Sequence, residues 1–142
     1  PTTTYYNTSS QNSISNVAGD GLYITNSLIS ATVENNSIDN NTQSGIVLSE
    51  VGEFVNAFSA FRKNRVTNNG ESGFFLYYAI GNNLSGNTIS GNGFGIIVNY
   101  SQDNQINSNT IQNSAYDGIY VNESANGNVF SRNRVQSSSL SG

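Results

Sequence analysis

Carboxylate side chains beside aromatic rings are the first feature of this chain that could do chemistry. Glu50 and Glu53 lie three residues apart, with Arg62 further along and Tyr77 and Tyr78 in the next repeat. Two carboxylates about 5–9.5 Å apart can serve as acid and base on a glycosidic bond. A Glu pair in a polar loop is more often solvated surface, so we carry Glu50 and Glu53 as weak catalytic candidates and expect no catalysis in this segment.

The composition excludes several kinds of site. The 142 residues contain no His and no Cys, which removes His-dependent triads and zinc sites of the usual type. Asp20 and Asp117 precede equivalent glycines but lie four repeats apart, roughly 19 Å at strand spacing, which is too far for a paired mechanism. We therefore expect no metal and no cofactor. The net charge of −4 argues against nucleic acid, and no apolar run reaches the ~20 residues of a membrane span.

An internal repeat shows which elements must position these side chains. The motif Asn-x-(Ile/Val) recurs at steps of 24, 28, 23, 22 and 24 residues. A second motif, Gly-Φ-x-Φ, follows each of the first five copies, and a third apolar column stands three residues before the Asn. The three columns are, in order, Asn12, Asn36, Asn64, Asn87, Asn109 and Asn133; Gly21, Gly45, Gly73, Gly95 and Gly118; and Val33, Phe61, Leu84, Ile106 and Phe130, with Ser9 in the first coil.

The spacing within each motif predicts strands. Apolar residues two apart share one face of a strand, and the intervening Gly, Asn, Ser and Asp are typical of turns. Each unit is too short for a crossover helix, so coils must stack directly and bury one continuous core. We predict an all-β, right-handed parallel β-helix of about five complete coils of 22–28 residues. It spans residues 12–135, with an N-terminal segment 1–11 that could cap one end and a C-terminal tail 136–142.

The repeated Asn has a structural explanation. An inward Asn in every coil can hydrogen bond to the Asn of the next coil and satisfy polar groups at a tight bend. We therefore expect a ladder of amides at this column and assign it no functional role.

The pattern Asn-x-Ile…Asn…Gly-Ile-x-Val, from about Asn12 to Val135, resembles the parallel β-helix repeats of the pectate-lyase-like superfamily. That group includes carbohydrate-binding and sugar-hydrolase repeats, periplasmic copper-pathway proteins and mannuronan epimerases. The resemblance implies the fold, and it leaves the activity open because many functions share these repeats. It also breaks at one place: the epimerases carry an Asp-Pro-His element, whereas this chain has no His and its only Pro is Pro1.

The two predicted outward faces differ in character. All twelve outward positions of the Asn-x-Ile strands are polar, so that sheet should face water. The outward column of the Gly-Φ-x-Φ strands contains no polar residue, and it continues into turns that carry more tyrosines. We predict that one face of the solenoid binds a ligand through Tyr23, Phe75, Tyr77, Tyr78, Tyr100, Tyr120, Asn99 and Asn122.

Three partners could cover this face. The insertion in the longest coil, residues 49–63 with apolar Val51, Phe54, Val55, Phe58 and Phe61, could fold over it. A sugar chain could stack on its aromatic rings. A second copy of the chain could pack on Val47 and Ile97, which suit a dry protein interface.

The leading hypothesis is a secreted module, or one on a cell or virion surface, that binds a polysaccharide and does no catalysis. The alternatives are a self-associating structural module (a fibre, tail-spike or head-to-tail filament subunit) and a fragment of a polysaccharide lyase or epimerase. The last coil lacks its Gly-Φ-x-Φ strand, and uncapped rungs expose strand edges that recruit other chains.

Overall fold

The computed structural model describes residues 6–27, 30–51 and 58–140, and the described residues form seventeen short strands in three parallel sheets. Sheet A contains β1 (Tyr6–Ser10), β4 (Ser30–Glu34), β7 (Ala60–Arg62), β10 (Asn83–Ser85), β13 (Gln105–Asn107) and β16 (Val129–Ser131). Sheet B contains β2 (Ser13–Ser15), β5 (Ser37–Asp39), β8 (Arg65–Thr67), β11 (Thr88–Ser90), β14 (Thr110–Gln112) and β17 (Arg134–Gln136). Sheet C contains β3 (Leu22–Ser27), β6 (Ile46–Val51), β9 (Ser72–Tyr77), β12 (Phe94–Asn99) and β15 (Ile119–Asn122).

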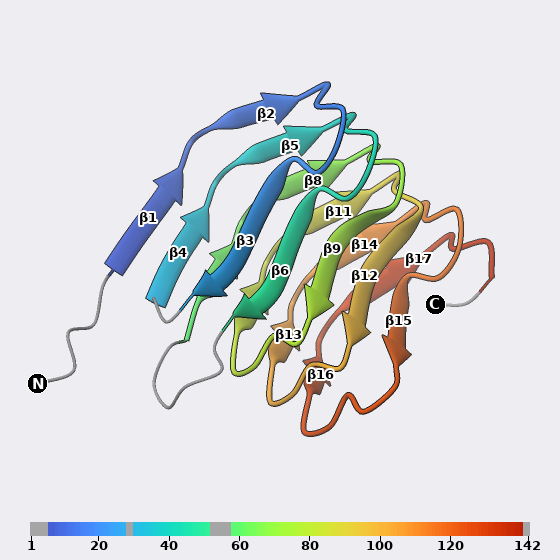
Figure 1. The fold of residues 1–142 in the computed structure, drawn as a ribbon. Helices are drawn as coiled ribbons and strands as arrows, with labels where there is room; N and C mark the ends of the chain where they lie inside the picture. Colours follow the sequence, from blue (N-terminus) through green and yellow to red (C-terminus); the bar gives the residue numbers. More distant parts are fainter. Residues whose placement is uncertain (1–5, 28–29, 52–57, 141–142) are drawn as a thin grey trace, which may run out of the picture.

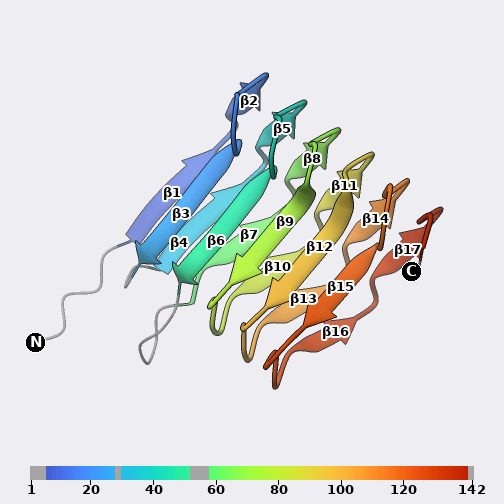
Figure 2. The same cartoon turned by 45° about the vertical axis from the view of Figure 1, so that its right-hand side comes forward.

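Each complete coil contributes one strand to sheet A, one to sheet B and one to sheet C, in that order. The chain then begins the next coil, which lies beside the previous one. Figure 1 shows sheet B continuing from sheet A at a bend, and Figure 2 shows the coils succeeding one another from β1 at one end to β17 at the other. The predicted stack of about five coils is confirmed, because sheet C has five strands in register and sheets A and B have six. The described residues include no helix that could span a membrane.

The core is a set of apolar columns along the solenoid axis. In sheet B, Ile38, Val66, Ile89 and Ile111 lie directly opposite one another on successive coils, and all are fully buried. Across the interior, the ring of Phe61 from sheet A meets Phe74 from sheet C edge to face, 6.2 Å between centroids. The predicted motif columns are therefore the structural columns, and burial of apolar area stabilises the stack.

The predicted asparagine ladder is present. In its centre, Asn87 accepts hydrogen bonds from the backbone N–H and the Nδ2 of Asn64 at its Oδ1, at 2.9 and 3.0 Å. Its own N–H and Nδ2 donate to Oδ1 of Asn109, and its Nδ2 also reaches the carbonyl of Phe61. Amides that bond along the axis in this way satisfy backbone groups that the bend removes from the sheets.

Two further ladders, which the sequence analysis missed, hold the other two bends. Asn41, Asn69 and Asn92 bond in series at the bend between sheets B and C, and Asn82, Asn104 and Asn128 bond in series at the bend into sheet A. The signal was available in the sequence: asparagines stand five residues before and after the first ladder, as in Asn82, Asn87 and Asn92. The sequence analysis recognised only the first Asn column, because serine, alanine or valine replaces Asn at the two neighbouring positions in some coils.

A left-handed residue precedes the ladder positions of the described coils. At the first bend, for example, Asn35, Lys63 and Ser108 have φ near +55°. Asn and Gly adopt this conformation most easily. The arc from sheet A to sheet C therefore has a nearly fixed length, and the coils differ mainly in the bend that follows sheet C.

The glycine of the Gly-Φ-x-Φ motif is required by close packing of the backbone. A Cβ added to Gly95 would lie 2.2 Å from the carbonyl oxygen of Gly118 on the next coil and 2.4 Å from Ile111. A Cβ on Gly45 would lie 2.3 Å from Val66. No side chain fits at Gly21, Gly45, Gly73 or Gly95, which explains why the motif begins with Gly in these four coils.

Two expectations differ from the structure. Val47 occupies its predicted outward position but is only 5% exposed, because its short side chain stands between the larger Tyr23 and Phe75 on the adjacent coils. Residues 6–10, expected in a separate N-terminal segment, form β1 and pair with β4 as the first strand of sheet A. Of the insertion, Val51 and Phe61 are buried in the core and Phe58 is exposed; Phe54 and Val55 lie outside the described residues.

We expect Asn87→Ala to lower the free energy of unfolding by about 3–5 kcal/mol. The change leaves the buried backbone N–H of Asn64 and the carbonyl of Phe61 without this hydrogen-bond partner. It also removes one of the two acceptors of the Asn64 Nδ2, which keeps the carbonyl of Val33, and each lost partner costs about 1–3 kcal/mol. Urea unfolding followed by circular dichroism measures the effect.

Asn12→Ala is the matched control, since Asn12 belongs to the same ladder but is exposed on its terminal coil. Its loss should cost less than about 1 kcal/mol. Equal effects of the two substitutions would contradict the view that buried ladder amides hold the bends.

Candidate functional site

The outward face of sheet C holds the predicted aromatic site. Its middle column reads Tyr23, Val47, Phe75, Ile97 and Tyr120 on five successive coils, and the register places each directly opposite the next. Tyr23 is 55% exposed and Tyr120 is 40% exposed, whereas Phe75 and Ile97 are half-buried. With Val47 buried, the exposed apolar surface is interrupted at the second coil and is concentrated on β9, β12 and β15.

A first aromatic cluster lies where β9 and β12 end, and we call Phe75, Tyr77, Tyr78 and Tyr100 the tyrosine cluster. The rings of Tyr78 and Tyr100 stack with centroids 5.0 Å apart and an interplanar angle of 11°. Tyr77 stands nearly perpendicular to both, at 4.6 and 6.0 Å, and also meets Phe75 at 6.0 Å. The structure thus brings four of the predicted residues into mutual contact, with Tyr78 43% exposed at the surface.

The backbone of this cluster is costly for tyrosine. Tyr78 and Tyr100 both have φ of +49°, and Glu50 has φ of +55° at the same turn of an earlier coil. A left-handed conformation costs a bulky L-residue about 1–2 kcal/mol, which Gly or Asn would largely avoid. The ladder bends of the same molecule use mostly Asn, Gly and Ser at such positions. Strain of this kind commonly marks a functional position, and here it displays two rings on one surface.

A second aromatic cluster lies near the start of β12 and consists of Phe94, Tyr116 and Tyr120. Phe94 packs against Tyr116 at 4.9 Å and against Tyr120 at 5.7 Å. Tyr116 is 49% exposed. Sequence analysis missed Phe94 and Tyr116 because both precede the Gly of their motif, and the repeat was read from the Gly onward.

Polar groups lie between and beside the two clusters. Asn99 and Asn122 follow Tyr77 in the next outward column of sheet C. The Oδ1 of Asn99 is buried and accepts no hydrogen bond within the described part of the chain. Beyond Asn122, the exposed Glu123 accepts a hydrogen bond of 2.6 Å from the Tyr100 hydroxyl.

The surroundings of Tyr77 and Tyr100 raise the pKa of both hydroxyls and so favour the neutral side chain. The hydrogen bond to Glu123 and the charge of that carboxylate raise the pKa of Tyr100 above 10.0. Burial raises the pKa of Tyr77, with smaller contributions from Tyr78 and Glu50. The Tyr100 hydroxyl therefore keeps its proton at physiological pH and donates a hydrogen bond to Glu123.

The carboxylate candidates do not form a catalytic arrangement among the described residues. Glu50 is exposed at the end of β6, close enough to Tyr77 to influence its pKa. Arg62 pairs instead with Glu34, at 3.1 Å, on sheet A. Glu53 lies outside the described residues. In the parts that the structure describes, no three acidic side chains gather in a group that could hold a metal.

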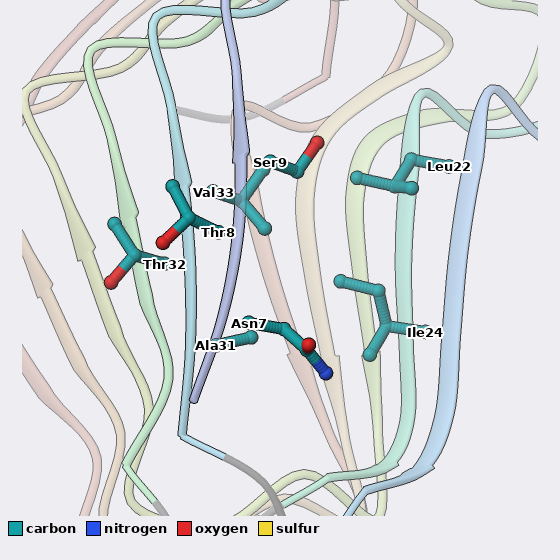
Figure 3. A pocket seen from close by; sticks show the side chains of 8 residues that line it. All are labelled: Asn7, Thr8, Ser9, Leu22, Ile24, Ala31, Thr32 and Val33. Carbon is teal, nitrogen blue, oxygen red and sulfur yellow. The ribbon is translucent and has the colours of Figure 1, made fainter. Parts of the chain in front are cut away.

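The N-terminal coil contains a cavity of about 200 Å³ on the interior side of the sheets. Figure 3 shows Asn7 and Ser9 of β1 facing this space together with Val33, Leu22 and Ile24. Its position marks the first coil of the core, where β1 supplies polar residues in place of the apolar column. The cavity does not open onto the aromatic face of sheet C.

Three parallel sheets that repeat coil by coil define a solenoid of the parallel β-helix class. A family model for the right-handed β-helix region matches residues 2–142. The chain therefore belongs to the right-handed β-helix family.

Similar solved structures share this fold. The periplasmic alginate epimerase AlgG superimposes with a TM-score of 0.76 at 18% identity, covering 90% of this chain and 39% of that one. A mutant of the same enzyme gives 0.74 at 19% identity, covering 91% and 39%. The chain thus spans about two fifths of the length of these structures. A search of curated proteins finds no sequence with significant similarity.

We expect Glu123→Gln to lower the pKa of Tyr100 toward 10.0, because the substitution removes the carboxylate charge that disfavours the tyrosinate. Carbon-13 NMR of labelled tyrosine during a pH titration measures this value. Stability contributed by the raised pKa is fully present below the unfolded value and is lost as pH rises through the folded one. Tyr77 serves as the internal control, since Glu123 is not among the causes of its raised pKa; an unchanged Tyr100 would contradict the assignment.

Proposed function

We propose that this chain is a secreted or surface-exposed β-helix module that binds a polysaccharide along the outward face of sheet C without catalysing its cleavage. One observation carries the proposal. Two aromatic clusters occupy that face, whereas the outward positions of sheet B are all polar. The asymmetry has no structural explanation, because both sheets stack by the same hydrogen bonds and bury the same kind of core.

The chemistry of the face fits a sugar chain. The C–H face of a pyranose ring packs on tyrosine and phenylalanine, while neighbouring polar groups fix its hydroxyls. Tyr78, Tyr116 and Tyr120 offer exposed rings. The hydroxyls of the exposed Tyr116 and Tyr120 can donate or accept hydrogen bonds, and the exposed Glu123 carboxylate can accept them.

The comparisons lend support at the level of the fold. AlgG is an alginate epimerase and is periplasmic, so a β-helix of this shape is compatible with a polysaccharide partner outside the cytoplasm. The chain departs from the epimerases in lacking the Asp-Pro-His element. A segment of a longer lyase or epimerase is the remaining enzymatic alternative, and it would place the reacting groups outside these 142 residues.

Self-association is the second candidate function, and it would use a different part of the outward face of sheet C. This alternative drew on Val47 and Ile97 as a dry interface, but Val47 is buried within the chain and Ile97 is half-buried. The apolar area left for a second copy on sheet C is correspondingly smaller. The exposed groups that remain on the face are chiefly tyrosines, which favours a sugar over a second copy on sheet C. A head-to-tail contact would instead use the uncapped C-terminal end, where Val121, Val129 and Phe130 are exposed.

We expect Tyr78→Ala and Tyr120→Ala each to weaken glycan binding about tenfold, since a lost stacking contact is worth roughly 1 kcal/mol or more. Wild type and variants are compared on a glycan array and then by calorimetry with the polysaccharides retained. Thr88→Ala, an exposed change on sheet B, is the control and should bind as wild type does. Binding that is unchanged in both tyrosine variants would overturn the proposal.

The solution mass separates the two candidates. We expect light scattering to give a mass near 15.2 kDa across a concentration series. A discrete oligomer or a growing polymer that is abolished by Tyr120→Ala would instead show that the chain itself covers this face.

A further inference from the structure

Positive charge is segregated away from the aromatic face. All five Lys and Arg residues lie on sheets A and B or on the bend that joins them. Arg62 is on β7, Arg65 on β8 and Arg134 on β17, and Lys63 and Arg132 stand at the bend. Since these five are the complete set for the chain, neither sheet C nor its flanking turns carries a cation.

Exposed carboxylates flank both aromatic clusters. Glu50 precedes the tyrosine cluster along the axis, and Glu123 follows it, bonded to Tyr100. Glu71 lies immediately before β9, and its carbonyl accepts a hydrogen bond of 2.6 Å from the N–H of Phe94. This backbone bond places the exposed Glu71 on the coil next to Phe94, at the same end of the sheet as the second cluster. All three side chains are exposed.

We infer that this face selects a polysaccharide without acidic groups and rejects polyuronates. The inference rests on the proposed function and adds the class of its ligand. An acidic glycan lying on Tyr78 and Tyr120 would place a carboxylate on nearly every sugar within a few ångströms of Glu50, Glu71 or Glu123. No cation on the face would offset the repulsion, and like charges brought together oppose binding.

The distances involved make this repulsion effective in physiological salt. Coils are separated by roughly 4.8 Å, so each of β9, β12 and β15 lies no more than about one coil spacing, well under a Debye length, from a coil that carries one of the three carboxylates. Uncharged sugars do not experience this field. The aromatic rings and Asn99 act on both kinds of glycan alike, so charge alone decides between them.

The experiment compares polymers that share a backbone and differ in charge: methyl-esterified and de-esterified polygalacturonan, hydroxyethyl- and carboxymethyl-cellulose, and alginate with its propylene glycol ester. Affinity electrophoresis with the full chain gives each affinity, and only binding that Tyr120→Ala weakens is counted. We expect at least about a tenfold preference for the uncharged form of any backbone that binds. The preference should shrink as salt is raised.

The triple variant Glu50→Gln, Glu71→Gln, Glu123→Gln tests the cause. We expect the ratio of affinities for uncharged over acidic polymer to fall about tenfold in this variant. The double change Arg65→Gln, Arg134→Gln on sheet B is the matched control and should leave the ratio unaltered. Since all five positions are exposed, each variant can be checked for wild-type unfolding before use.

The possible results distinguish a failure of the charge selection from a failure of the proposed polysaccharide binding. Tyrosine-dependent binding that is equal or tighter for an acidic polymer, or a ratio that the triple variant leaves unchanged, overturns the charge selection and leaves the binding face intact. Absence of tyrosine-dependent binding to every polymer overturns the proposed function itself, and the inference with it.

Discussion

The whole molecule depends on one hydrogen-bond pattern, in which each coil satisfies the backbone of its neighbour. Along the strands this is the parallel ladder, and at the bends the asparagine amides continue it, as when Asn87 joins Asn64 to Asn109. Without those amides, every bend would bury unpaired N–H and C=O groups. The apolar columns add burial, but they can stack only because the bends hold successive coils in register.

Because the core and the ladders hold the coils together, the outward side chains are not needed to maintain the stack. Inward positions are fixed by the core and the ladders, and the glycine column is fixed by contact between backbones. Outward side chains contact neighbours on their own coil and on the adjacent coils, as Tyr77 contacts Tyr78 and Tyr100. A column of like residues, such as the rings of Tyr78 and Tyr100, therefore forms by placing one residue type at one phase of the repeat. A surface of this kind presents the same groups at regular intervals, as a polymeric ligand does.

The repeat phase made most of the fold predictable. Strand positions, the inward columns and one ladder followed from residues such as Asn36, Ile38 and Gly45, because a period of two within a period of about 24 leaves few alternatives. The burial of Val47 was not predictable, since it depends on the sizes of side chains on the adjacent coils. Phe94 and Tyr116 were missed because both precede the Gly from which the repeat was read, although Phe94 already belongs to β12. The binding role of the eight predicted face residues remains a prediction.

Coil length varies mainly in the bend that follows sheet C, and this bend is therefore where the chain can accept insertions and deletions. Asn-x4-Asn-x4-Asn and the glycine that follows keep nearly constant spacing, while the segment from sheet C to the next sheet A lengthens from Gly45 to Ser59. The added residues lie in the sequence between Glu50, at the end of β6, and Ser59, which bonds to the third ladder at Asn82. Insertions and deletions during evolution would thus act on the border of the aromatic face while the scaffold stays the same. For an engineer, this bend is the position at which to graft a loop that alters recognition.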